Sequence, residues 1–267
     1  MRAHRAFVQA GERMSSNPSP YDDGELYDAF FERFRDDLPF YLAFAREGGG
    51  AFLDLACGTG RVLIPLLEAG LDGDGVDSSE PMLARCRVKA REIGRQPGLV
   101  HADMRSFRAP RRYTRAYCAF NAFAHNLDRA AQLGALTRVR EALVDGGAFA
   151  VDLGFPRSEL WASRPDQRVL EVDCPHPTRP TRLCMYDRRT MNPVEQTQHS
   201  QIEIEELDAQ GALLARHVSL TALRWIYKNE LELLFAAAGF TRWEIHAGFG
   251  REPLGPDAQQ LVAIAWH

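Results

Sequence analysis

Short apolar runs that contain or end in an acidic residue recur through the first half of the chain. Stretches with helical periodicity follow the first two of them, beginning at Arg61 and at Ser79. Buried strands alternating with helices are typical of a parallel sheet covered by helices, so we predict an α/β fold. The runs and their acids are 51–55 with Asp54, 71–77 with Asp77, and 99–104 with Asp103.

The rest of the chain continues this pattern on both sides of a long insertion. The further predicted elements are a strand at 117–121, a helix at 129–143, a helix end, glycine turn and strand within 143–152, a helix at 229–238, and strands at 240–245 and 260–266. Gly239 suits the residue after a helix end, where a left-handed backbone is common. We expect the last two strands to form an antiparallel pair at one side of the sheet.

The segments outside the alternating region divide the chain further. Residues 21–46 carry aromatic residues at roughly helical spacing, and the stretch after the strand at 143–152 is too long for a bare loop. Alternation at 182–186, 201–207 and 215–225 predicts antiparallel strands there. We divide the chain into a flexible N-terminal segment (1–20), a helical lid (21–47), a core (48–154), an inserted antiparallel β cap (155–227), and the C-terminal helix and strand pair of the core (228–267).

The turn from Asp54 to Gly60 indicates a site for a small adenosine-containing ligand. Gly58 and Gly60 allow a tight turn, and the N–H groups at the start of the next helix face a ligand above the sheet. The nicotinamide dinucleotide fingerprint G-x-G-x-x-G is not met, because Leu63 stands at the third glycine. A Walker phosphate loop is excluded, because no Gly-Lys-Ser/Thr follows.

Asp54, Ala56, Gly58 and Gly60 form the pattern D-x-A-x-G-x-G, which resembles the first motif of class I S-adenosylmethionine (SAM) methyltransferases. The later strand ends follow in that family's order over residues 51–154. The resemblance implies a Rossmann-like, seven-stranded sheet with its last strand antiparallel, an N-terminal helical lid and an inserted antiparallel β roof. The layout is similar to that of small-molecule N-methyltransferases acting on glycine or on nucleotide-linked amino sugars.

The resemblance also implies where SAM is held. Asp77 takes the ribose hydroxyls, Asp103 takes the adenine amino group, and the next backbone N–H, that of Met104, contacts a ring nitrogen. The alternatives are that Asp54 caps the turn, that Asp77 caps the next helix, and that Asp103 is a solvated loop acid. The full set of expected cofactor-binding residues is Tyr21, Asp54, Ala56, Gly58, Thr59, Gly60, Arg61, Asp77, Ser78, Met82, Asp103, Met104 and Phe120.

The candidate catalytic residues are His125, Asn121 and Tyr27. His125 follows the strand at 117–121, where the methyl group is expected to point, and an imidazole titrates near neutrality. It is a candidate general base for an acceptor that arrives protonated. Asn121 is a candidate for orienting the acceptor or the amino acid end of SAM, and a tyrosine face suits a positive charge. The alternatives are a pocket-shaping loop histidine and a tyrosine in core packing.

The composition restricts the kinds of partner and the location that we expect for the protein. The net charge is −4 and the pI is near 6.1, which does not favour a nucleic-acid partner. Five cysteines without a C-x-x-C spacing are typical of reduced, cytoplasmic thiols. No apolar run approaches the ~20 residues of a membrane helix. Arginine supplies almost all of the cations, which favours a high-GC bacterial source and secondary metabolism. We expect a monomer or homodimer, and the start codon is Met1 or Met14.

The function predicted from these residues is transfer of a methyl group from SAM to an amine or hydroxyl of a small metabolite. No metal-ligand spacing is present, so we expect a metal-free, in-line displacement. Two alternatives stay open: cyclisation or lyase-type cleavage of SAM by the same fold, and a nicotinamide-dependent dehydrogenase. No motif identifies the acceptor.

Overall fold

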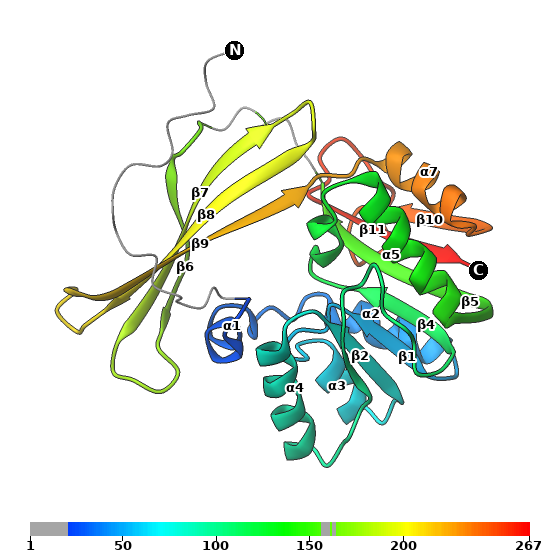
Figure 1. The fold of residues 1–267 in the computed structure, drawn as a ribbon, viewed down its shortest axis with the longest axis horizontal. Coiled ribbons are helices and arrows are strands. Elements are labelled where there is room, and N and C mark those ends of the chain that lie inside the picture. The colour runs from blue at the N-terminus through cyan, green and yellow to red at the C-terminus, as the bar shows by residue number, and fades with distance from the viewer. Residues whose placement is uncertain (1–20, 156–160, 162–163) are drawn as a thin grey trace.

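A seven-stranded mixed sheet forms the centre of the protein (Figure 1). The computed structural model describes residues 21–155, 161 and 164–267. The strand order is β10-β11-β5-β4-β1-β2-β3. Strand β11 runs in the direction opposite to that of the other six strands. The strands are β1 (Phe52–Leu55), β2 (Gly73–Asp77), β3 (Leu99–His101), β4 (Tyr113–Cys118), β5 (Leu143–Gly154), β10 (Arg242–His246) and β11 (Gln260–Trp266).

Helices cover both faces of this sheet, because its central strands are apolar on both sides. Helices α2 (Leu38–Glu47), α3 (Leu63–Glu68) and α4 (Glu80–Glu92) pack on one face, and α5 (Arg129–Ala142) and α7 (Lys228–Ala238) pack on the other. Ser79 caps α4 by accepting from the Met82 N–H at 3.4 Å, as its place before Pro81 predicts. Gly239 ends α7 with a φ of 86°.

The aromatic segment predicted as one helical lid is divided between two layers. Helix α1 (Gly24–Phe31) ends before a bend, and α2 begins after it with Pro39 in its first turn. The Tyr41 hydroxyl of α2 donates to Asp152 at 2.5 Å, and its ring lies 4.7 Å from that of Tyr117. Helix α2 is therefore part of the core, and only α1 lies over the site.

A second sheet, called the roof below, is built from the insertion. It contains four antiparallel strands in the order β6 (Arg168–Pro175), β7 (Arg182–Asn192), β8 (Thr197–Leu207) and β9 (Leu213–Arg224). The sequence predicted β7, β8 and β9 but missed β6, where a bulge between Leu170 and Val172 interrupts the alternation. In Figure 1 the roof stands beside the core with α1 between them.

One face of the roof packs on α1. Phe30 of α1 is buried among apolar side chains of β6, β7 and β8, namely Cys174, Leu183, Met185, Ile202 and Ile204. Helix α1 also contacts α4 of the core. This face is called the inner face below. It is the face that continues over the carboxyl ends of the parallel strands, where open α/β sheets bind their ligands.

Candidate active site

A cavity of about 1090 Å³ opens at the carboxyl edge of the parallel strands. Its wall comes from the loops after β1, β2 and β4, from the region around α1, from β9 of the roof, and from the start of β11. Pockets for a single small ligand usually occupy about 300–1,000 Å³. The volume is therefore sufficient for a cofactor together with an acceptor.

The glycine loop forms the floor of the cavity. Gly58 has a φ of 54°, and an added Cβ there meets no atom within 4 Å, so the backbone faces open space. At Gly60, with a φ of 84°, an added Cβ would lie 2.7 Å from Ile64 and 2.8 Å from Cys86. The first glycine thus keeps the backbone open to a ligand, and the second lets the loop pack against helices α3 and α4.

Asp77 links the end of β2 to this loop. One carboxylate oxygen accepts the Gly58 N–H at 2.8 Å, and the other accepts the Ser79 N–H at 2.8 Å. Burial raises the pKa of Asp77, while these backbone N–H groups oppose the shift. Asp77 and Ser78 both line the cavity, and each carboxylate oxygen retains capacity for a second hydrogen bond.

Asp54 and Arg61 lie deeper in the wall. Burial raises the pKa of Asp54 well above its usual range, although the charge of Arg61 opposes this. The Arg61 guanidinium donates to both oxygens of Asp37, at 2.8 and 2.5 Å, and to the Phe34 carbonyl at 3.0 Å. It lies 4.6 Å from the Phe120 ring centroid. Arg61 therefore anchors the segment between α1 and α2 and presents a cation that Asp37 already neutralises.

A smaller cavity of about 170 Å³ shares part of its wall with the first. Asp103 and Met104 line it, together with Ala56, Asp77 and His125. In this structure Arg105 binds Asp103 through its guanidinium, at 2.8 and 2.5 Å, and lowers the pKa of that acid. The pair is largely exposed, so it contributes little free energy and an adenine amino group can compete for the carboxylate.

The loop after β4 has a strained backbone that Asp152 holds in place. Phe120 and Asn121 have φ values of 58° and 59°, which are unusual for residues other than glycine. The Asp152 carboxylate accepts both of their N–H groups, at 2.7 and 3.2 Å, and the Asn121 side chain accepts the Gly154 N–H at 3.1 Å. Phe120, Asn121 and Asp152 all line the cavity.

His125 lies at the junction of the core and the roof. It ends the short 3-10 helix η1 (Ala122–His125) and lines both cavities. Its Nδ1 lies 3.2 Å from the Ala222 carbonyl of β9. A carbonyl can only accept, so Nδ1 carries the proton and Nε2 is left as the basic nitrogen. Desolvation lowers the pKa of His125 below its ordinary 6.5, with the Ala222 bond opposing it.

Aromatic side chains enclose the cavity on the α1 side. The Tyr21 ring meets the His125 ring edge-on, with centroids 5.8 Å apart. Tyr27 packs on Phe31 at 5.0 Å, and Phe31 packs on Phe120 at 5.5 Å. Tyr21, Tyr27, Phe31 and Phe120 all line the cavity. Such faces suit a positively charged ligand group.

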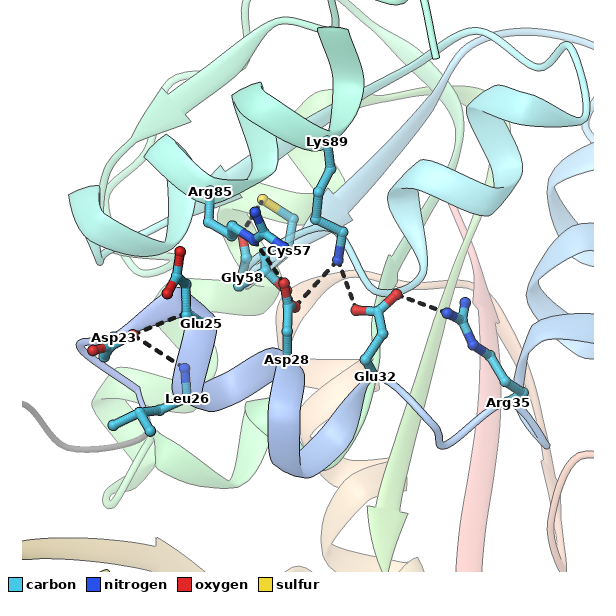
Figure 2. A network of polar contacts seen from close by, with 11 residues as sticks. Asp23, Glu25, Leu26, Asp28, Glu32, Arg35, Cys57, Gly58, Arg85 and Lys89 are labelled. Carbon is cyan, nitrogen blue, oxygen red and sulfur yellow. Dashed lines mark hydrogen bonds and ion pairs between the residues drawn. The ribbon is translucent and has the colours of Figure 1, made fainter. Parts of the chain in front are cut away.

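Ion pairs hold α1 against the core. Figure 2 shows Asp28 of α1 and Glu32, the residue after its last turn, directed toward Arg85 and Lys89 of α4. Asp28 pairs with Arg85 at 2.8 Å and with Lys89 at 3.2 Å, and it accepts the Thr59 hydroxyl at 2.7 Å. Lys89 also pairs with Glu32 at 2.7 Å. We call these five residues the α1 clasp, and it joins the cavity's cover to the glycine loop.

The structure gathers most of the predicted residues into the two cavities but leaves three outside their walls. Thr59, Gly60 and Met82 line neither cavity. Thr59 is fully buried and binds Asp28, Gly60 packs on α3 and α4, and Met82 is buried in the first turn of α4. Each has a packing or hydrogen-bonding role beneath the site.

The sequence reasoning missed several wall residues. Asp152 is the most important, because it orders the strained loop, and an acid at the end of an apolar strand was its available signal. Thr221 and Leu223 of β9 had no signal, because nothing in the sequence shows which roof residues face the core. Gln259 and Gln260 enter the wall from the start of β11.

Comparison with known proteins finds one matching family model and one curated relative. Residues 52–147 match the family model described as a methyltransferase domain. The dTDP-3-amino-3,6-dideoxy-alpha-D-glucopyranose N,N-dimethyltransferase of Streptomyces fradiae is 30% identical over 137 residues, covering 48% of this chain and 51% of the relative. The match thus spans about half the length of that relative.

Two solved structures share the fold over most of their length. The CcbJ methyltransferase from Streptomyces caelestis is 24% identical, with a TM-score of 0.74 over 92% of this chain and 96% of that chain. SAM-bound CalS10, an amino pentose methyltransferase from Micromonospora echinaspora, is 18% identical, with a TM-score of 0.67 over 87% of this chain and 91% of that chain.

Residues 52–147 therefore contain a methyltransferase domain, and the whole chain has the fold of the two methyltransferase structures. The structures confirm the predicted fold with its last strand antiparallel, and the matched domain and the relatives support the predicted class and SAM as its cofactor. The two solved structures cover about nine-tenths of this chain, so the likeness includes the roof. Within the described residues, no helix is long and apolar enough to cross a membrane.

The charges of the residues that line the cavity also suit the charges of SAM. Asp54, Asp77 and Asp152 line the cavity, and its one buried cation, among the described residues, is Arg61, which Asp37 neutralises. A net negative wall with aromatic faces suits a ligand that carries a sulfonium and an ammonium group. The open backbone at Gly58 leaves room for close approach of such a ligand.

Proposed function

We propose that this protein transfers a methyl group from SAM to the amino group of a sugar-type small metabolite. The observation that carries the proposal is His125, which lines the cavity and whose Nδ1–H is held by the roof, so that Nε2 is its basic nitrogen. An amino group that arrives as an ammonium needs such a base, because its electron pair is blocked by the proton. The sugar class is supported by the curated relative.

The residues that we expect to hold SAM are among those that line the two cavities. We assign Asp77 and Ser78 to the ribose, Asp103 and Met104 to the adenine in the smaller cavity, and Asp54 to the amino acid end, because these residues line the two cavities. When bound, SAM supplies a methyl group on a positively charged sulfur that is a good leaving group. Metal-free transfer is part of the proposal.

The protein's own contribution is positioning and removal of one proton. His125 accepts the proton of the acceptor ammonium at Nε2, and Ala222 stabilises the charge that the ring then carries. Tyr21, Tyr27 and Phe120 exclude water from the cavity and present aromatic faces to positive charge. Asn121 is placed by the strained loop to orient the acceptor. Holding the reactants in line contributes on the order of 7–11 kcal/mol to lowering the barrier.

The test is an acceptor panel with labelled SAM. A nucleotide-linked 3-amino sugar, the same sugar with a 3-hydroxyl, and glycine are each incubated with the protein, and products are identified by mass spectrometry. We expect S-adenosylhomocysteine and a methylated product with the amino sugar alone. Transfer to the 3-hydroxyl sugar at an equal rate contradicts the amine, and methylthioadenosine formed without any acceptor contradicts methyl transfer itself.

A further inference from the structure

Part of the roof's inner face is polar and buried, and the wall residues of the cavity lead directly to it. Thr221 and Leu223 of β9 line the cavity. Their directly opposite partners on β8 are Ser200 and Gln198, and Ser200 in turn lies opposite Arg189 of β7. Directly opposite residues in an antiparallel pair project from the same face of the sheet. This polar row therefore lies on the same face of the roof as the two wall residues and directly behind them, outside the cavity wall itself.

The row is joined by hydrogen bonds that end at Asp187. The Gln198 amide donates to the Ser200 hydroxyl at 2.8 Å, and that hydroxyl donates to one Asp187 oxygen at 3.2 Å. Arg189 pairs with the same oxygen at 2.9 Å and also with Glu171. Asp187, Ser200 and Gln198 are 5%, 4% and 6% exposed.

Two buried acceptors remain without a hydrogen-bond partner among the described residues. They are the second oxygen of Asp187 and the side-chain oxygen of Gln198. The Nε of Arg189 beside them is a buried donor that also has no partner among the described residues. Leaving buried polar atoms in this state is costly, so the row indicates a ligand with hydroxyl groups, which both donate and accept. The two acids outnumber the single arginine by one charge, which favours a donor-rich or cationic ligand over an anionic one.

Tyr21 connects this row to the catalytic end of the cavity. Its ring contacts His125, and after burial the charge of Asp187 is the next cause that raises the pKa of the Tyr21 phenol. Asp187 is thus close to a residue that touches the base.

We propose that Asp187 and Gln198 form the acceptor subsite and bind the hydroxyl groups that flank the reacting amine of a sugar-type acceptor. The inference rests on the proposed function and specifies which part of the acceptor is recognised. A 3-amino hexose has a hydroxyl on each side of its amine, which matches two unpartnered acceptors. Asp187 and Gln198 are specificity-determining residues in this assignment and take no proton during the reaction.

The experiment combines a variant with a truncated acceptor. Asp187→Asn keeps the size of the side chain but removes the charge, and the 4-deoxy and 2-deoxy forms of the nucleotide-linked 3-amino sugar each remove one hydroxyl. We expect Asp187→Asn to lower kcat/KM for the full sugar about 10- to 100-fold, as for loss of a hydrogen bond to a charged group. We expect no further loss on one of the two deoxy sugars, and an unchanged Kd for SAM.

Asp173→Asn is the matched control, because Asp173 lies on the other face of the roof and pairs with the exposed Arg182. It is expected to behave as wild type. An Asp187→Asn variant that loses the same factor on the full sugar and on both deoxy sugars has a structural defect, and that result overturns the subsite. So does wild-type kcat/KM in the variant.

Equilibrium binding separates this proposal from the function on which it rests. The full amino sugar is titrated into wild type and Asp187→Asn in the presence of S-adenosylhomocysteine, by calorimetry. Binding by wild type that weakens in the variant supports the subsite even if no methyl transfer occurs, and in that case the proposed function alone fails. Absence of binding by wild type overturns the subsite.

Discussion

The floor and the roof of the cavity hold their polar groups in different ways. On the floor, the carboxylates of Asp77 and Asp152 accept backbone N–H groups of the loops they order. On the roof, Asp187 is held by the side chains of Ser200 and Arg189. An acid on the floor therefore determines the main-chain path of a loop, whereas Asp187 on the roof determines only the positions of the side chains next to it. Substitutions in the roof can change the acceptor without changing the fold of the cofactor site.

Removal of the base is expected to have the largest effect, because it acts where floor and roof meet. We expect His125→Ala to lower kcat about 10²- to 10⁴-fold, the usual contribution of a positioned general base. The Kd of SAM, measured by calorimetry, is expected to stay within twofold. His176→Ala, in the connection between β6 and β7, is the control. Equal loss of turnover and SAM affinity would make His125 a structural residue.

Loss of a floor acid is expected to weaken the cofactor directly. Asp77→Ala removes the acceptor of the Gly58 N–H together with the ribose acceptor, so we expect the Kd of SAM to rise at least about tenfold. Asp72→Ala, just before the other end of β2 and paired with exposed Arg111, serves as the control. Unchanged SAM affinity in Asp77→Ala, with a correctly folded protein by circular dichroism, would contradict the ribose assignment.

The pH dependence of kcat/KM tests the protonation state of His125, which lies at the junction of the core and the roof. His125 works as a base only when neutral, and its pKa is lowered, so we expect kcat/KM for the amino sugar to fall below a midpoint under pH 6.5. The decrease approaches tenfold per pH unit and should be absent in His125→Ala. A wild-type midpoint above 6.5 contradicts the lowered pKa of His125.

The α1 clasp is expected to have the smallest effect. Asp28→Asn weakens two ion pairs, and we expect it to lower the local stability of α1 by about 1–2 kcal/mol, measured by hydrogen exchange of its amides. Burial raises the pKa of Asp28, but Thr59, Arg85 and Lys89 lower it overall. The contribution of Asp28 to the clasp is therefore fully present above pH 3.8 and is lost as the pH falls through its still lower folded pKa.

A control for the clasp lies on the same helix. Among the described residues, the Glu25 carboxylate has no ion pair or hydrogen bond and acts on Arg85 only through its charge, so Glu25→Gln should change the exchange of α1 less than Asp28→Asn does. Faster exchange in Glu25→Gln than in Asp28→Asn would show that the charge of α1, and not the clasp, sets its stability.

The sequence predicted the floor better than the roof for a physical reason. Asp54, Asp77 and Asp103 follow apolar strands, and a strand end defines a place at the edge of a sheet. Asp152 has the same signal and was still missed, because nothing in one sequence shows that it binds Phe120 and Asn121. The break between α1 and α2 was hidden by aromatic residues that continue across it.

The roof could not be predicted beyond the existence of three strands. Alternation showed that Arg182, Tyr186 and Arg188 share a face, but not which face meets the cavity. The register places Tyr186 and Arg188 opposite Glu203 and Gln201, on the face away from Thr221. The row from Gln198 to Asp187 is buried yet polar, so the rule that buried residues are apolar does not reveal it.

The bond between His125 and the Ala222 carbonyl fixes which ring nitrogen carries the mobile hydrogen. Because the partner is main chain, any residue that keeps β9 in place at position 222 gives the same tautomer. The chemistry at Nε2 thus depends on docking of the insertion as a whole and not on the identity of any side chain in it. An isolated core without the insertion would retain the imidazole but lose the means of directing its basic nitrogen toward the acceptor.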